Sequence, residues 1–142
     1  MSLQGKRILL GVTGGIAAYK ACELLRLLVK AGADVEVMMT KAAAQFVGPL
    51  TFETPSGKPV AEDLWDPKMR LPHISLRKNK DLIVIAPATA NIIAKAANGI
   101  ADDLVSSTLL ARECPLMLCP AMNVQMWRNA ATVRNIQTLK GD

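Results

Sequence analysis

The sequence predicts a single α/β domain built on a doubly wound parallel sheet. Short, almost uninterrupted apolar runs rich in β-branched residues alternate with longer segments of helical periodicity. Strands that helices cover on both faces have this continuous apolar character, because each crossover between parallel strands lays a helix over the sheet. With 142 residues, 51% of them hydrophobic, the chain is long enough to bury one core.

The first half of the chain contains two of the expected strands, at residues 6–12 and 34–40. Between them, residues 14–33 have helical spacing and reach a C-cap signal at Gly32. The apolar positions that define this spacing are Ile16, Tyr19, Leu24, Leu27 and Leu28. Residues 41–46 follow as a short helical piece.

Residues 48–72 predict a long irregular connection, because they contain five prolines. Long loops in compact domains tend to be functional. A short polar helix is expected after His73. The remaining expected elements are strand 81–87, helices 89–99 and 103–112, strand 115–120 and a helical tail over 128–142.

Composition excludes several classes of protein. The net charge is +5, but the basic residues are scattered and only 4% of residues are aromatic, which argues against a nucleic-acid surface. No apolar stretch reaches membrane-spanning length and no secretory signal is visible, so a cytoplasmic protein is expected. The three cysteines lack CxxC spacing, which argues against a disulfide framework or a zinc site.

Four of the expected strands end in unusual polar or proline-containing sequences: GVTGG (11–15), VMMTK (37–41), IAPATAN (85–91) and LCPAMN (118–123). In a parallel sheet these ends meet at one edge, and ligands bind there, around the point where the strand order reverses. The sequence therefore predicts one crevice lined by four strand ends.

The glycine turn after the first strand is a candidate phosphate site. Gly14 and Gly15 would let the backbone approach a ligand, and the Thr13 hydroxyl could assist. A tight turn without a ligand explains the same residues equally well. The spacing is not GxGxxG, and Asp34 and Glu36 lie at the beginning of the second strand instead of its end, so a mononucleotide fits better than a dinucleotide.

Three polar residues have both a structural and a functional interpretation. Thr89 and Asn123 could simply cap the helices that follow them, or could offer polar groups to a ligand. The Asn123 amide can donate to a carboxylate, with Met122 and Met126 as an adaptable wall. His73, the only histidine, is either an ordinary packed or surface residue or a proton acceptor placed after the long connection. Trp127 is expected in the core.

Several motifs together resemble one family. GVTGGIAAYK, PHISL, APATANIIAKAANGIADDL and PAMNVQMW are similar to the flavin-containing cysteine decarboxylases, and among these to the phosphopantothenoylcysteine decarboxylase domain of bifunctional coenzyme A biosynthesis proteins. The resemblance extends from Lys6 to about Lys140, and the PxMNxxMW pattern with an upstream histidine is its most specific part.

The resemblance implies a Rossmann-like, flavodoxin-like subunit that holds FMN between neighbouring subunits, as a homotrimer or a homododecamer. It implies catalytic roles for His73 and Asn123, with Asn123 and Met126 at the substrate. The flavin contacts that it implies are Gly14, Gly15, Ile16, Thr40, Lys41, Thr89, Ala90, Asn91, Ile92 and Ala121.

In the family's scheme the flavin oxidises the cysteine side chain to a thioaldehyde, which lets the carboxylate leave and places the resulting charge on sulfur. The implied activity is decarboxylation of 4'-phosphopantothenoylcysteine to 4'-phosphopantetheine. The family's decarboxylases carry a further cysteine on a substrate flap beyond PxMNxxMW. We expect residues 1–142 to be one FMN-binding domain, truncated before that flap and before any synthetase domain.

Other functions remain open on the sequence. A non-catalytic, FMN-binding regulatory protein of the same family would share most of these motifs. A related lyase or prenyltransferase of the flavin type would carry motifs that are not evident here. A pyridine-dinucleotide oxidoreductase is the generic alternative for any strand–glycine turn–helix unit, and the missing acidic residue speaks against it.

Overall fold

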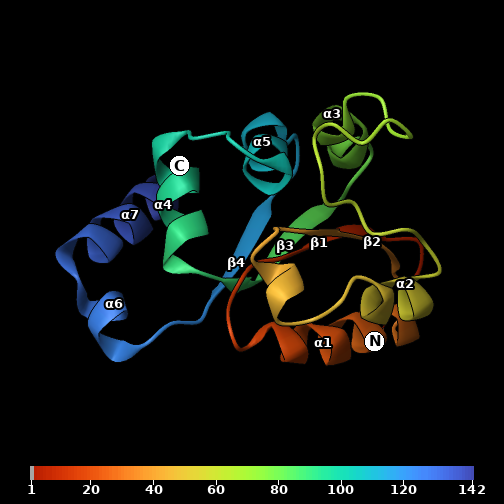
Figure 1. Ribbon diagram of the computed structural model, residues 1–142, viewed down its shortest axis with the longest axis horizontal. Helices are drawn as coiled ribbons and strands as arrows, with labels where there is room; N and C mark the ends of the chain where they lie inside the picture. Colours follow the sequence, from red (N-terminus) through yellow and green to blue (C-terminus); the bar gives the residue numbers. More distant parts are fainter. Residues whose placement is uncertain (1) are drawn as a thin grey trace.

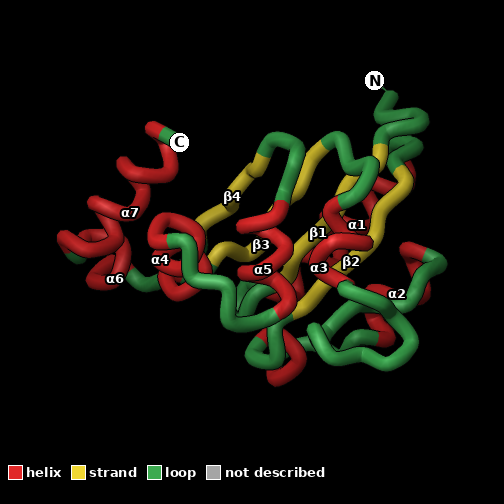
Figure 2. Tube along the Cα trace, turned by 90° about the horizontal axis from the view of Figure 1, so that it is seen from above, coloured by secondary structure: helices red, strands yellow, loops and turns green. Residues whose placement is uncertain are grey.

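The computed structural model describes residues 2–142 and contains one four-stranded sheet with the order β2-β1-β3-β4. The strands are β1 (Arg7–Val12), β2 (Asp34–Met39), β3 (Leu82–Ala88) and β4 (Leu116–Pro120), and every pair is parallel. Figure 2 shows the strands lying side by side, with β2 and β4 at the two edges. The order reverses between β1 and β3, which confirms the predicted doubly wound, flavodoxin-like sheet.

Helices cover both faces of the sheet (Figure 1). On one face lie α1 (Ala18–Lys30) and α2 (Leu50–Ser56), with the 3₁₀ turn η1 (Ala43–Gln45) between β2 and α2. The other face carries α3 (Pro72–Arg77), α4 (Ala90–Asn98) and α5 (Leu104–Ala111). After β4 come α6 (Val124–Arg128) and α7 (Ala130–Gly141), and α7 packs beside α4. Within residues 2–142, no helix combines the length and the apolar character needed to span a membrane.

The sheet divides the core into two halves, as the alternation of side chains along each strand requires. On β1, Ile8, Leu10 and Val12 face α1 and α2, whereas Leu9 faces α4 and α5. All four side chains are buried. Burial on both faces explains why the strands read as continuous apolar runs.

The helix predicted over 14–33 is present as α1. Of the apolar positions that define its spacing, Leu24 and Leu28 pack against the core, and the other three are exposed. Ile16, Tyr19 and Leu27 are 78%, 62% and 54% exposed. The residues against the sheet are Ala18, Ala21 and Leu25, which are at most 3% exposed. Apolar side chains occupy more than one stripe of α1, and the small alanines are the ones that let the helix approach the sheet.

The predicted irregular connection over 48–72 is wrong at residues 50–56, which form α2. Pro49 is the N-cap residue, where a missing N–H leaves no intrahelical bond unmade. Pro55 lies inside the helix, one residue before its end, so only the last turn loses a backbone hydrogen bond. Phe52, which is fully buried, holds α2 against the core, and Gly57 ends it in the left-handed conformation at φ 70°. The segment between Ala61 and α3 is irregular, as predicted.

Trp127 was expected in the core but is 47% exposed on α6. It borders a second cavity of about 620 Å³, between β4 and helices α4, α5 and α7. Leu116 and Leu118 of β4 line the same cavity, because β4 is an edge strand whose side chains are only partly covered.

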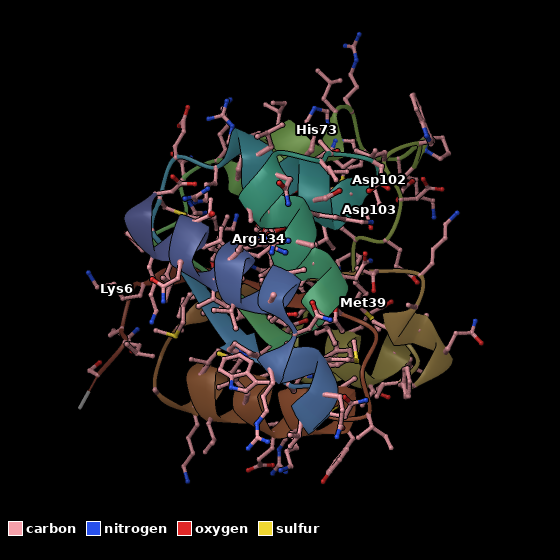
Figure 3. The ribbon with its side chains drawn as sticks, turned by 90° about the vertical axis from the view of Figure 1, so that its left-hand side faces the viewer. Lys6, Met39, His73, Asp102, Asp103 and Arg134 are labelled. Carbon is pink, nitrogen blue, oxygen red and sulfur yellow. The ribbon has the colours of Figure 1, made fainter. Side chains whose placement is uncertain are left out.

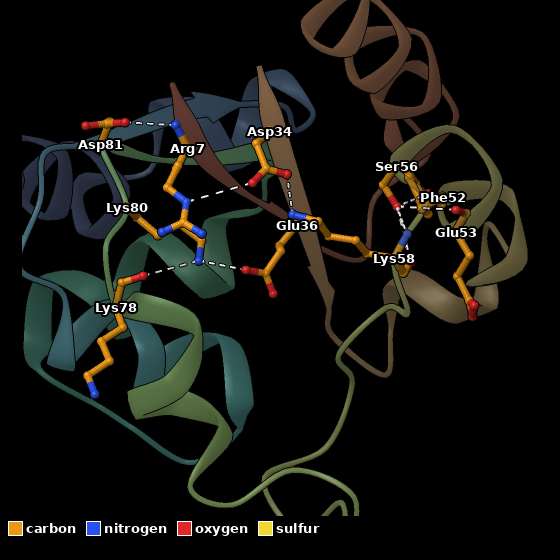
Figure 4. A network of polar contacts seen from close by, with 10 residues as sticks. All are labelled: Arg7, Asp34, Glu36, Phe52, Glu53, Ser56, Lys58, Lys78, Lys80 and Asp81. Carbon is orange, nitrogen blue, oxygen red and sulfur yellow. Dashed lines mark hydrogen bonds and ion pairs between the residues drawn. The ribbon is translucent and has the colours of Figure 1, made fainter. Parts of the chain in front are cut away.

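Ion pairs occupy the amino ends of the strands, on the edge opposite the strand ends singled out above (Figure 4). Asp34 pairs with Lys58 and, at 3.8 Å, with Arg7. The Lys80 ammonium lies 2.8 Å from a Glu36 carboxylate oxygen. The hydrogen bond from Lys58 is the main cause of the lowered pKa of Asp34. Asp34 and Glu36 therefore each form ion pairs with basic side chains. Both lie far from the carboxyl edge of the sheet, where a ribose would bind.

Candidate functional site

The carboxyl ends of all four strands open into one cavity of about 880 Å³. It lies where the strand order reverses between β1 and β3, the usual ligand position in such sheets. Every site residue predicted from the sequence, except His73, lines this cavity. These residues are Gly14, Gly15, Ile16, Thr40, Lys41, Thr89, Ala90, Asn91, Ile92, Ala121, Asn123 and Met126.

The glycine turn after β1 is held against the loop that follows β2. A Cβ on Gly14 would lie 2.4 Å from the Ala42 Cβ and 3.0 Å from the Ala42 carbonyl carbon, so only glycine fits there. Gly15 is less confined, since the nearest atoms to a Cβ would be 3.8 Å away, on Pro87 and Thr89. The two glycines therefore have different reasons to be present, and the first is required by packing.

We expect Gly14→Ala to destabilise the fold by roughly 1–3 kcal/mol, because the added methyl forces the turn and the Ala42 backbone apart. Gly15→Ala is the matched control and should change the free energy of unfolding by less than about 1 kcal/mol. Urea denaturation of both variants measures the difference. Equal destabilisation by the two substitutions would contradict the packing assigned to Gly14.

Thr13 lines the cavity, but its hydroxyl is engaged by backbone groups of the protein. The hydroxyl donates to the Pro87 carbonyl oxygen and accepts from the Thr89 amide at 3.2 Å, and Thr13 is only 1% exposed. Since the hydroxyl hydrogen is donated to Pro87, the assistance to a phosphate expected from this side chain stays a prediction.

The start of α4 forms a second wall. Thr89 is its N-cap, as one of the two interpretations predicted, and its side-chain oxygen accepts from the Ile92 amide at 3.2 Å. The amides of Ala90 and Asn91 belong to the first helical turn, where no intrahelical acceptor exists. With the small side chain of Ala90, this wall offers backbone donors and little steric bulk to a ligand.

Asn123 caps α6, and the cap determines which of its atoms remains available. Its Oδ1 accepts from the Met126 amide at 2.9 Å. The Nδ2 group, which carries two hydrogens, is thereby left to donate elsewhere. Asn123 is exposed at the cavity, beside Met122 and the 44% exposed Met126. Helix capping and ligand binding are therefore compatible at this residue.

His73 lies outside the cavity. Among residues 2–142 it is absent from the cavity lining, and it sits on α3, which packs against α5. Figure 3 shows His73 beyond Asp102 and Asp103, well separated from Met39 at the end of β2. Its Nδ1 is buried without a hydrogen-bond partner in the described part of the chain. One copy of the chain does not bring His73 and Asn123 together.

Charged residues that the sequence reasoning missed line another part of the cavity. Lys95 of α4 lies 2.8 Å from Asp102 and 3.9 Å from Asp103. The Lys95 hydrogen bond is the main cause of the lowered pKa of Asp102. Asp103 forms a capping box with Ser106 at the start of α5. A polar residue directly ahead of an apolar helix is a capping signal, and this signal could have identified Asp103 from the sequence.

The long connection after β2 also contributes to the cavity, through Glu62, Asp63, Leu64 and Trp65. Trp65 is 84% exposed, and the Asp63 carboxylate accepts a hydrogen bond from the Trp65 backbone amide at 3.0 Å. The length of this loop had indicated a functional role, but nothing in its composition identified which residues reach the cavity.

The cysteines are free and stand apart from this chemistry. Burial raises the pKa of the thiols of Cys22, Cys114 and Cys119. None of them is among the cavity residues in the described range 2–142. A thiol with a raised pKa is a poor nucleophile, so these side chains act as apolar packing.

Comparison with known proteins gives a consistent result. The model of the family described as Flavoprotein matches residues 1–141. The chain is 52% identical over 140 residues to the coenzyme A biosynthesis bifunctional protein CoaBC of Vibrio cholerae, with 97% of this chain and 35% of that protein aligned. It thus spans about a third of the length of the curated relatives that it matches.

Two solved structures are similar over nearly the whole chain. The FMN-dependent cysteine decarboxylase SpaF has a TM-score of 0.93 at 37% identity, covering 99% of this chain and 82% of SpaF. A PPC decarboxylase mutant complexed with pantothenoylaminoethenethiol has a TM-score of 0.84 at 32% identity, covering 96% of this chain and 78% of that protein.

Proposed function

Because this chain belongs to the Flavoprotein family, we propose that it binds FMN and takes part in the decarboxylation of 4'-phosphopantothenoylcysteine to 4'-phosphopantetheine in coenzyme A biosynthesis. One observation carries the proposal: the four strand ends form a single cavity that collects all the expected flavin contacts together with Asn123. The names of CoaBC, SpaF and the PPC decarboxylase mutant support the substrate and the cofactor.

The residues of the cavity fit a flavin mononucleotide in size and chemistry. About 880 Å³ lies within the range of small-molecule sites. Gly15, Ala90 and Ala121 leave room for a planar ring, and the first-turn amides of α4 can donate to its polar edge. Lys41 supplies a positive charge for a phosphate at the end of β2. Thr40 accepts the Ala43 amide at 3.1 Å and can still donate its own hydroxyl hydrogen.

In the proposed reaction FMN, when bound, supplies the two-electron oxidation that makes loss of CO2 from the cysteinyl carboxylate feasible. Asn123 orients that carboxylate through the Nδ2 group that its capping role leaves free. Met126 provides an apolar wall beside it. His73 accepts the proton released from the substrate.

We further propose that His73 reaches the site from a neighbouring copy in a homo-oligomer, either a homotrimer or a homododecamer built from trimers. Three observations support a shared site. His73 is outside the cavity of its own chain, and its Nδ1 has no partner within residues 2–142. Leu71, two residues earlier, is 65% exposed and holds a left-handed conformation at φ 45°, a strained state typical of functional segments. Ile16 and Trp65, both at the cavity, are strongly exposed and available to a second copy.

The free thiols of the three cysteines are consistent with a cytoplasmic location for the protein.

The proposal is tested by the absorption spectrum of the protein, by titration with FMN and by CO2 release. We expect purified protein to absorb near about 450 nm, or the ligand-free protein to gain that band when FMN is added. CO2 should be released from 4'-phosphopantothenoylcysteine in a single turnover with protein in excess. A parallel titration with NAD serves as the control, and we expect no binding. A colourless protein that ignores FMN and binds NAD would overturn the proposal in favour of a pyridine-dinucleotide oxidoreductase.

A further inference from the structure

The hydrogen bonding between β1 and β3 changes in character just before the cavity. Their backbone register ends at the Gly11–Ile85 pair. The pairing of β3 with β4 is also irregular between Ile85 and Ala88. Polar backbone groups of β3 beyond Ile85 therefore need other partners, since unpaired buried groups are costly.

The Thr13 side chain supplies these partners. Its hydroxyl donates to the Pro87 carbonyl oxygen and accepts the Thr89 amide at 3.2 Å. Thr13 is 1% exposed and Pro87 is also buried, so water does not replace either bond readily. One side chain thus continues the connection between β1 and β3 where the backbone ladder stops.

The two connected segments are the two walls of the cavity described above. Thr13 is followed directly by the Gly14–Gly15 turn, and Thr89 is followed by the first turn of α4, which it caps. The walls are close at their base, because a Cβ on Gly15 would lie 3.8 Å from side-chain atoms of Pro87 and Thr89. The Thr13 hydroxyl thus links the two walls at their base.

We propose that Thr13 is a positioning residue for the flavin. Its hydroxyl contacts no ligand and instead fixes the gap between the glycine turn and the start of α4 into which the planar ring fits. This inference rests on the proposed function, and it assigns to Thr13 a role different from the phosphate contact that the sequence suggested.

The test compares FMN dissociation constants, measured by flavin fluorescence, for folded variants of the ligand-free protein. Thr13→Val keeps the branched shape and removes both hydrogen bonds, and we expect its affinity for FMN to fall at least about tenfold. Thr13→Ser retains the hydroxyl and should restore the affinity to within about threefold of wild type. If the valine variant does not fold, Thr13→Ala is titrated with the same expected loss.

Thr108→Val is the matched control. Thr108 is fully buried in α5, its hydroxyl donates to the Leu104 carbonyl oxygen at 2.7 Å, and it does not line the cavity in the described part of the chain. This variant should leave the dissociation constant unchanged whatever its stability. A folded Thr13→Val or Thr13→Ala protein with wild-type affinity would overturn the positioning role and leave the proposed function standing. A wild-type protein that does not bind FMN would refute the proposed function itself.

Discussion

Replacing Asn123 with aspartate is expected to slow CO2 release on the order of a hundredfold or more while the fold keeps its stability. Aspartate caps helices as well as asparagine does, so the Met126 amide keeps its acceptor and the free energy of unfolding should change by less than about 0.5 kcal/mol. The substitution turns the Nδ2 donor into a second carboxylate oxygen. That oxygen would repel the substrate carboxylate that the asparagine is proposed to orient.

Asn129→Asp is the matched control for this prediction. Asn129 also caps a helix, because its Oδ1 accepts the Ala131 amide at 2.9 Å, and it is absent from the cavity lining within residues 2–142. We expect this variant to release CO2 at the wild-type rate. Single-turnover CO2 release and urea denaturation are measured on both variants. An unchanged rate of CO2 release by the Asn123→Asp variant would show that Asn123 does not orient the substrate carboxylate.

The position of the cavity could be predicted from the sequence because a parallel sheet converts sequence order into spatial order. Once residues 11–15, 37–41, 85–91 and 118–123 were identified as strand ends, parallel pairing alone placed them at one edge. This step needs no side-chain detail. It explains why all the predicted flavin contacts lie around one cavity.

The details that failed depend on tertiary packing. Tyr19 and Ala21 of α1 are both compatible with a buried helical face, and only the distance of α1 from the sheet selects the alanine. The double role of the Thr13 hydroxyl arises because the β1–β3 ladder stops at Gly11, which no local pattern reveals. Lys95 and Asp102 meet through the turn between α4 and α5.

The separation of His73 from Asn123 has a different cause. Their proposed cooperation requires a second copy of the chain. The sequence alone does not indicate which copy supplies which residue. The distinction can be tested, since a site shared between copies can be rebuilt from two inactive variants, whereas a site within one chain cannot.

We therefore expect His73→Gln and Asn123→Asp proteins, each inactive alone, to regain CO2 release when mixed as subunits. In a mixed oligomer a site is intact when the copy supplying histidine carries Asn123→Asp and the neighbouring copy carries His73→Gln. Random mixing of equal amounts makes about one site in four intact, and purification through two tags, which removes pure oligomers, raises this to about one in three for a trimer, so roughly a quarter to a third of the wild-type rate should return. The two variants are co-expressed with different tags and purified through both, and mass spectrometry verifies that mixed oligomers formed. Two differently tagged His73→Gln chains, treated in the same way, should stay inactive. Mixed oligomers that remain inactive would mean that His73 and Asn123 act within one chain, whereas activity of either variant alone would mean that its residue has no part in the reaction.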